Sequence, residues 1–187
     1  MLFFFKRKKI VVDCFTYDPL ILELSPINKS SAFYPEWWKN TPKEYIQSNG
    51  FEQSTIKKCD GFLENYKNGI MIPLWCDLNI KVHENVIQWQ FADLKTKAIS
   101  HDADQWKTFA DPMNVFQLKI MSPWRLKSKH DTKFFWTKPY WNFPVFDNVS
   151  IPSAILEFKY QTGTNINLFF DLTKDYNMTC DHRDRKS

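Results

Sequence analysis

Apolar and polar residues alternate along much of the chain, and the longest such stretch runs from Ile70 to Val82. Every second residue in it is apolar, and the residues between them, Trp75 included, point the other way. Because successive side chains of a strand point to opposite faces, this pattern predicts one long half-buried strand. Pro73 has no N–H to donate, so we expect it at an edge or a bulge of the sheet.

The same alternation predicts two hairpins. His83 to Asn85 is a polar turn, after which Ile87, Trp89 and Phe91 return on the core face. A second hairpin is expected where residues 122–127 and 132–138 flank the polar segment 128–131. Further strands are predicted at 8–17, 114–121, 154–160 and 165–170.

Helix signals are few, and the best of them spans residues 59–69. Asp60 is expected to cap this helix, Leu63 and Tyr66 to face inward, and Gly69 to end it in a left-handed conformation. Single turns are also expected within residues 31–48 and 100–109.

About eight to ten short strands, mostly joined by hairpins, indicate a mainly β fold, an antiparallel sandwich or barrel of jelly-roll type with one or two short helices. The chain has 187 residues, of which 43 % are hydrophobic and 17 % aromatic, which argues against disorder. We predict a single β-rich domain over residues 1–187. Its charged end, residues 173–187, is interpreted as a polar tail, and this end is either native or shortened.

The charge is only mildly basic, with a net charge of +4 and a pI of about 8.8. Nucleic acid is therefore not an expected partner, and the basic run at Lys6–Lys9 is interpreted as a solvated edge. No run of 18 apolar residues is present, so no membrane association is predicted. The scattered cysteines and the lack of a secretory signal favour a soluble protein in a reducing compartment.

Familiar catalytic and cofactor motifs are missing from the sequence. The four glycines form no phosphate-binding loop, and no His-x-Asp/Glu pair is available for a metal on a strand, so no cofactor and no metal are predicted. The cluster at residues 101–104 either binds a divalent cation, is a solvated run, or caps the next turn through Asp104. Cys76 is expected to pack in the core, and Cys59, beside two lysines, is the more reactive thiol.

Two segments, residues 34–43 and 136–144, combine tryptophans with prolines. Such segments either close the open ends of a sandwich or line a groove for an extended peptide, a sugar or unstacked bases. Of the adjacent pair, Trp37 is expected to anchor the loop in the core and Trp38 to be partly exposed. The groove would be built from Trp37, Trp38, Trp75, Trp136, Tyr140 and Trp141, with Lys39, Lys43 and Lys138 at its rim.

Five sequence segments carry a resemblance: "PEWWKNTPK", "TIKKCDGF", "KNGIMIPLWCDLNI", "SPW" and "YQTGTNINLFF". With them, most of residues 30–172 resembles a family of uncharacterised proteins found in marine tailed phages, with bacterial relatives. This resemblance implies a phage origin and a place in the cytoplasm of an infected host cell or on the virion. It implies no reaction and no catalytic residues.

Members of that family continue past the "GTNINLFF" strand into a further strand, whereas this chain ends in a polar tail. The barrel would then lack its last strands and leave an edge exposed. Either that edge pairs with a second copy, giving a homodimer, or the chain is a decayed gene product.

The leading functional hypothesis is a non-enzymatic β-domain that binds a protein or a glycan through the aromatic groove. The alternatives are an auxiliary metal-dependent oxygenase of jelly-roll type and a minor structural component of the virion.

Overall fold

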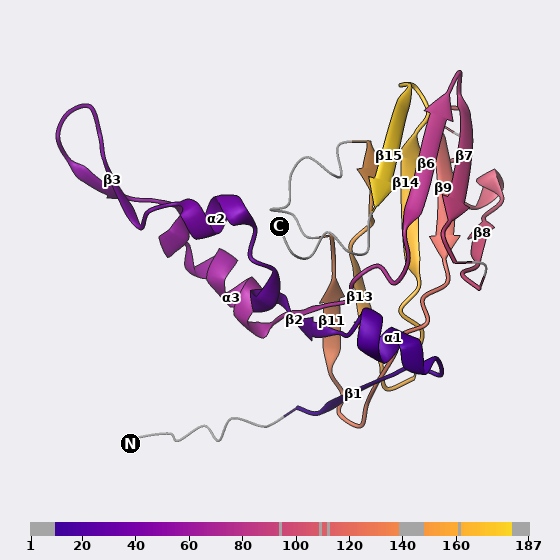
Figure 1. Ribbon diagram of the computed structural model, residues 1–187, viewed down its shortest axis with the longest axis horizontal. Coiled ribbons are helices and arrows are strands. Elements are labelled where there is room, and N and C mark those ends of the chain that lie inside the picture. Colours follow the sequence, from indigo (N-terminus) through magenta and orange to yellow (C-terminus); the bar gives the residue numbers. More distant parts are fainter. Residues whose placement is uncertain are drawn as a thin grey trace.

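A computed structural model describes residues 10–93, 95–108, 110–111, 113–138, 148–160 and 162–180. The predicted class is confirmed, because the chain is mainly β with antiparallel sheets and short helices (Figure 1). Within the described residues the sheets resemble a sandwich and do not close into a barrel. The elements in chain order are β1 (Val12–Phe15), α1 (Pro19–Leu24), β2 (Asn28–Lys29), η1 (Ser30–Phe33), α2 (Glu36–Asn40), β3 (Glu44–Ile46), β4 (Glu52–Ser54), η2 (Ile56–Lys58), α3 (Asp60–Asn68), β5 (Ile70–Met71), β6 (Leu78–His83), β7 (Val86–Phe91), β8 (Ala98–Ser100), η3 (Ala103–Gln105), β9 (Val115–Ile120), β10 (Arg125–Ser128), β11 (Lys133–Trp136), β12 (Val149–Ser150), β13 (Ala154–Glu157), β14 (Ile166–Asp171) and β15 (Tyr176–Cys180).

The main hydrophobic core lies between two sheets, one ordered β12–β14–β9–β8 and the other β15–β6–β7. Strand β6 alternates strictly between buried and exposed residues, as its sequence predicts. Its buried side chains Leu78, Ile80 and Val82 belong to one core cluster with Leu118 of β9 and Phe170 of β14. The alternation therefore gives this pair of sheets one shared interior and two outer faces.

The first predicted hairpin is confirmed as β6–β7. Its turn residues Glu84 and Asn85 both have positive φ, of 49° and 63°, as a tight hairpin turn requires. Trp89 lies on the predicted inward face, 5.4 Å between ring centroids from Phe116, yet 39 % of it is exposed. Trp89 therefore covers the border of the core.

The predicted long strand from Ile70 to Val82 is wrong in one respect, since it breaks into β5 and β6. Pro73 lies in the irregular connection and has no N–H to continue a ladder. Trp75 and Cys76 are both buried, which two successive residues of a strand with one wet face cannot be. Trp75 thus lies in the core, where its Nε1 donates to Thr96 Oγ1 at 2.9 Å, and offers no ring to a ligand.

The second predicted hairpin does not form. β10 pairs with β1 and β11 pairs with β13, so residues 125–136 lie beside residues 154–160 and 162–163 instead of folding back on themselves. The amides of Leu126 and Ser128 donate to the carbonyls of Thr162 and Phe158, at 2.9 and 3.3 Å. Ser128, expected in a polar turn, is only 2 % exposed, and its hydroxyl donates to the Val11 carbonyl. β10 and β11 therefore pair with strands distant in sequence, β1 and β13, and not with each other.

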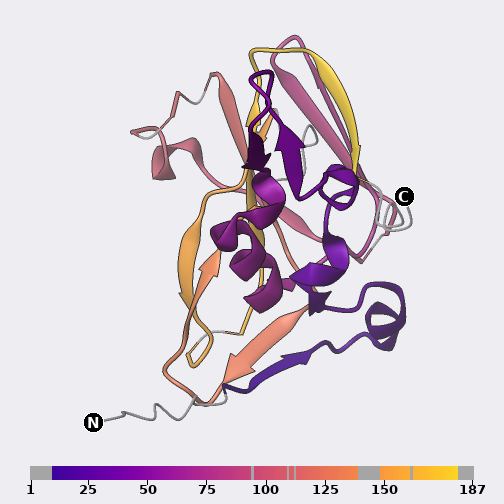
Figure 2. The ribbon, with the colours of Figure 1, turned by 90° about the vertical axis from the view of Figure 1, so that its left-hand side faces the viewer.

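Residues 28–71 leave the sheets through the two-stranded β2–β5 ladder and form an arm that contains α2, α3 and the β3–β4 hairpin. Figure 1 shows the arm extending away from the sheets, and Figure 2 looks onto it from that side. The predicted helix is confirmed as α3, and Tyr66 is buried as expected, but the second buried residue is Phe62 and Leu63 is only half-buried. Its caps differ from the prediction, because Cys59 is the N-cap and Gly69 has an ordinary φ of −79°.

The predicted polar tail begins with a strand. β15 pairs with β6 along its whole length, and Tyr176, Met178 and Cys180 are half-buried while Asn177 and Thr179 are exposed. This period of two was present in the sequence and was masked by the charged residues around it. Among the described residues, β15 is therefore one edge of this sheet and β7 is the other, and residues 181–187 lie outside the described residues.

Candidate functional site

The arm is held together by a stack of aromatic rings. Tyr34 stacks on Trp38 with centroids 4.0 Å apart and on Tyr66 at 4.7 Å. Phe62 lies 4.8 Å from Tyr66 and 5.9 Å from Trp38. Such near-parallel contacts contribute beyond the area that they bury. The stack fixes α2 against α3, and the arm has its own small core apart from that between the sheets.

Lys57 closes the outer side of this stack. Its Nζ lies 4.9 Å from the ring centroid of Trp38 and donates to the Lys39 carbonyl at 2.7 Å. Burial and the neighbouring Tyr34 raise the pKa of the Tyr66 phenol. Neither Trp38 Nε1 nor the Tyr66 hydroxyl has a hydrogen-bond partner in the described part of the chain, although both atoms are buried. The interior of the arm is thus held mainly by the packing of aromatic rings and not by hydrogen bonds between their polar atoms.

The adjacent tryptophans have opposite roles from those predicted. Trp38 is the ring inside the stack, and Trp37 is the more exposed one, at 37 %. Both lie on the short helix α2, where successive residues diverge by about 100°, so the two rings approach Phe62 from different directions, with centroid distances of 6.0 Å for Trp37 and 5.9 Å for Trp38. The expectation that Trp38 would be the exposed ring of the pair was wrong, because α2 turns that ring towards Tyr34 and Phe62.

Beyond the aromatic stack the arm carries the β3–β4 hairpin. All six residues of its strands are exposed, in the register Glu44↔Ser54, Tyr45↔Gln53 and Ile46↔Glu52. Three large apolar side chains lie on it: Tyr45 is 47 % exposed, Ile46 75 % and Phe51 67 %. Gly50 has a φ of +84°, which closes the tip. The hairpin therefore presents apolar groups far from any core.

The base of the hairpin is anchored, in contrast to its tip. The Thr55 amide donates to the Lys43 carbonyl at 3.0 Å, and Lys58 forms an ion pair with Glu44. The hydrogen bond from Lys58 lowers the pKa of Glu44, while the hydrogen bond with Glu44 raises the pKa of Glu52. Charges of both signs thus lie beside Ile46, on its face of the hairpin.

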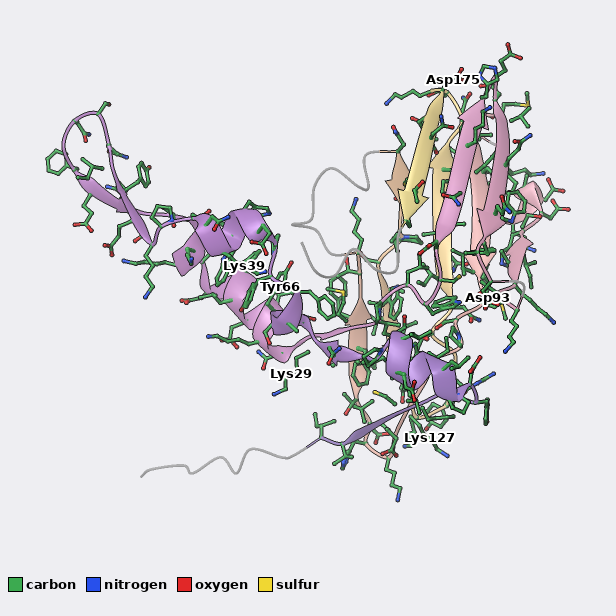
Figure 3. All side chains as sticks on the ribbon, viewed as in Figure 1. Lys29, Lys39, Tyr66, Asp93, Lys127 and Asp175 are labelled. Atoms are coloured by element: carbon green, nitrogen blue, oxygen red, sulfur yellow. The ribbon has the colours of Figure 1, made fainter. Side chains whose placement is uncertain are left out.

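The predicted groove residues are placed in three parts of the molecule. Trp37, Trp38, Lys39 and Lys43 share the arm, where Lys39 pairs with Glu36. Trp136 ends β11 and Lys138 follows it, both half-buried, whereas Trp75 lies in the core. Tyr140 and Trp141 lie outside the described residues. Figure 3 shows Lys39 and Tyr66 together in the arm, away from Asp93 and Asp175. The described residues do not form the predicted groove as one surface.

The hairpin residues Tyr45, Ile46 and Phe51 were missed at the level of sequence. A signal was present, because Asn49-Gly50 between two short segments is a strong hairpin motif. The segment lacks the apolar alternation of a buried strand, since neither of its faces is covered. A search for strands by their core face therefore passes over it.

The acidic cluster at residues 101–104 serves as a helix cap. Asp102, and not Asp104 as expected, accepts a hydrogen bond from the amide of Asp104 at 2.8 Å. His101 Nδ1 lies 2.8 Å from Gln105 Oε1. Among the residues that the structure describes, no three His, Cys, Asp or Glu side chains are grouped to hold a metal ion. The structure thus favours the capping role for this cluster.

Comparisons with protein-family models, with curated proteins and with solved structures gave no match. The resemblance to phage proteins therefore stays a prediction. No helix in the described ranges is long and apolar enough to cross a bilayer.

Proposed function

We propose that this protein is a non-enzymatic binding protein whose arm inserts the β3–β4 hairpin into an apolar pocket of a partner protein. The observation that carries the proposal is the exposure of Tyr45, Ile46 and Phe51 on a hairpin whose base is fixed. Tyr45 and Phe51 lie on one face of the hairpin and Ile46 on the other, so both faces carry exposed apolar groups, which are typical of interaction sites.

The hairpin meets the energetic requirements of such a contact. A two-stranded hairpin is marginal by itself, but the Lys43–Thr55 backbone bond and the Glu44–Lys58 ion pair hold its base. The aromatic stack in turn fixes the arm, so little conformational entropy is lost on binding. Burying two or three large apolar side chains is the usual centre of a protein–protein contact.

The chemistry of the partner follows from the surroundings of these side chains. Glu44, Glu52 and Lys58 lie on the hairpin flanks, so we expect an apolar pocket bordered by charges of both signs. The outer edges of β3 and β4 also offer backbone groups to a strand of the partner. The resemblance described above adds the proposed setting, an infected bacterial cell or a virion.

The test compares the wild type with an Ile46→Ser/Phe51→Ser variant. Each tagged protein is incubated with bacterial lysate, and the captured proteins are quantified by mass spectrometry. A protein depleted with the variant is then purified and titrated by calorimetry. We expect the double substitution to weaken its binding by at least about tenfold.

The matched control removes exposed apolar groups elsewhere, with Leu22→Ser on α1 and Tyr160→Ser after β13, at 53 % and 78 % exposed. This control should bind as the wild type does. Equal binding of the purified partner to the hairpin variant, or no protein depleted with it, would refute the proposal.

The predicted homodimer through an edge strand is a separate proposal, with β15 as the edge. Light scattering coupled to size-exclusion chromatography tests it, and a monomer at high concentration would count against it.

A further inference from the structure

The outer face of the β15–β6–β7 sheet carries a hollow of about 500 Å³. Its walls are two cross-strand rows of side chains, because the sheet register aligns one residue from each strand in each row. The rows are Asn177–Lys81–Gln88 and Thr179–Asn79–Gln90. Between them lies a third row, Met178–Ile80–Trp89, whose side chains point into the core, so that its backbone forms the floor. The hollow is thus a shallow cup on a sheet, away from the arm.

Four of the six wall residues are carboxamides, and all six are exposed. Thr179 donates to Asn79 Oδ1 at 2.9 Å. In the described part of the chain, no side-chain hydrogen bond is formed by the other four wall residues, which are Lys81, Gln88, Gln90 and Asn177. A carboxamide holds two donors and an acceptor in one plane, and sugar hydroxyls likewise donate and accept. The cup is therefore a set of ready hydrogen-bonding groups.

The choice of residues goes beyond what an exposed sheet face needs. Asparagine is depleted in strands, yet Asn79 and Asn177 occupy interior positions of β6 and β15. Threonine or another β-branched residue would suit both positions better. Departures from local preference are expected at functional sites, and here two of them line one hollow.

A smaller hollow of about 180 Å³ continues the cup and shares Lys81 and Gln88 with it. It is bordered by His83 and Glu84, and His83 Nδ1 lies 2.7 Å from Asp175 Oδ2. Lys81 is the only charged wall of the cup, and two carboxylates lie at this end, so a polyanion is disfavoured. From Asn79 to His83 the track is roughly 13 Å long.

We infer that this track binds a short stretch of a neutral glycan, held by hydrogen bonds from the amide walls. The site is distinct from the hairpin and does not depend on the function proposed for it. A neutral chain suits the track because its hydroxyls match the amides and it carries no charge for Glu84 and Asp175 to repel.

The test titrates the full chain with cellohexaose, maltohexaose, mannohexaose and chitohexaose, by calorimetry and by amide chemical shifts. We expect at least one to bind and to shift the amides of residues 79–81, 88–90 and 177–179. The Gln88→Thr/Asn177→Thr variant should lower that affinity at least about tenfold, with an unchanged melting temperature because both replacements favour strands.

Gln53→Thr is the matched control, since Gln53 is an exposed amide on the strand β4. It should leave the affinity as in the wild type. The inference is overturned if none of the four hexasaccharides binds, or if the shifts lie elsewhere. It is also overturned if the double variant binds equally well, or if single-stranded DNA binds the track and displaces the sugars.

Discussion

The rings of Tyr34 and Trp38 lie 4.0 Å apart and 11° from parallel, and they pack the residue before Pro35 against α2. Tyr34 also stacks on Tyr66, so a single residue before Pro35 connects both helices of the arm. In the tryptophan–proline segment, Trp38 therefore stabilises the arm by packing inside the aromatic stack. Binding to a partner is proposed instead for the hairpin that this stack supports.

Removal of the central ring should loosen the arm and leave the sheets intact. In Trp38→Ala the contacts with Tyr34 and Phe62 and the cation–π contact with Lys57 are lost. We expect amide exchange in α3 to rise by roughly a hundredfold, equivalent to about 3 kcal/mol. Hydrogen exchange read by mass spectrometry measures this. Exchange in β14 is the internal control, and equal acceleration in both would show that the arm has no separate core.

A methyl group at Gly69 should destabilise the neck of the arm. A Cβ there would lie 2.6 Å from Ser30 Oγ and 2.7 Å from the Asn65 carbonyl oxygen. Because φ is −79°, the cost comes from crowding and not from backbone strain. We expect Gly69→Ala to lower the free energy of unfolding by about 1–3 kcal/mol in urea titrations. Ser30→Ala should recover part of this loss in the double variant, and full additivity would contradict the crowding.

The hydrogen bond between Trp124 and Ser25 should be worth a measurable part of the stability. Trp124 is 2 % exposed, and its Nε1 donates to the Ser25 carbonyl at 3.0 Å. Trp124→Phe leaves that carbonyl without this buried partner, which costs about 1–3 kcal/mol. Trp89→Phe is the control at 39 % exposure and should cost less than about 1 kcal/mol. Equal losses in urea unfolding would refute the assignment.

Stability should fall in strongly alkaline solution because of Tyr176. Burial, with a smaller effect of Asp171, raises the pKa of this phenol from 10.0 to about 12. Tyr176 then ionises at lower pH in the unfolded chain than in the native one. Its contribution to the free energy of unfolding is therefore complete below pH 10 and is lost as the pH rises towards about 12. Tyr176→Phe lacks this loss, so its melting temperature should decline less than that of the wild type between pH 10 and 11.5. Parallel declines would contradict the shift.

The cysteines should react with a thiol reagent in an order set by exposure. Cys14 and Cys59 are exposed, whereas burial raises the pKa of Cys76 and of Cys180. Partial burial also raises the pKa of Cys14, so we expect Cys59 to react first. Mass spectrometry after brief alkylation identifies the site. Cys76 should react only on unfolding, and early modification of Cys76 would contradict its place in the core.

Local pattern accounted for the elements whose partners are neighbours in the chain. The β6–β7 hairpin, β9 and α3 were all predicted, because a turn or a helix is fixed by residues close in sequence. The β3–β4 hairpin had a turn signal too, but no covered face to mark its strands. The β3–β4 hairpin was therefore not predicted, because its strands have no buried face and so lack the alternation by which the other strands were found.

The sequence by itself determined the mainly β class and which face of β6 is buried, since a period of two depends only on the backbone. The tertiary structure decided which strands pair, as β1 does with β10 across more than a hundred residues. It also decided that Trp38 is covered and that Ile46 is exposed. Pairing and burial depend on surfaces brought together from distant parts of the chain, and no local pattern contains them.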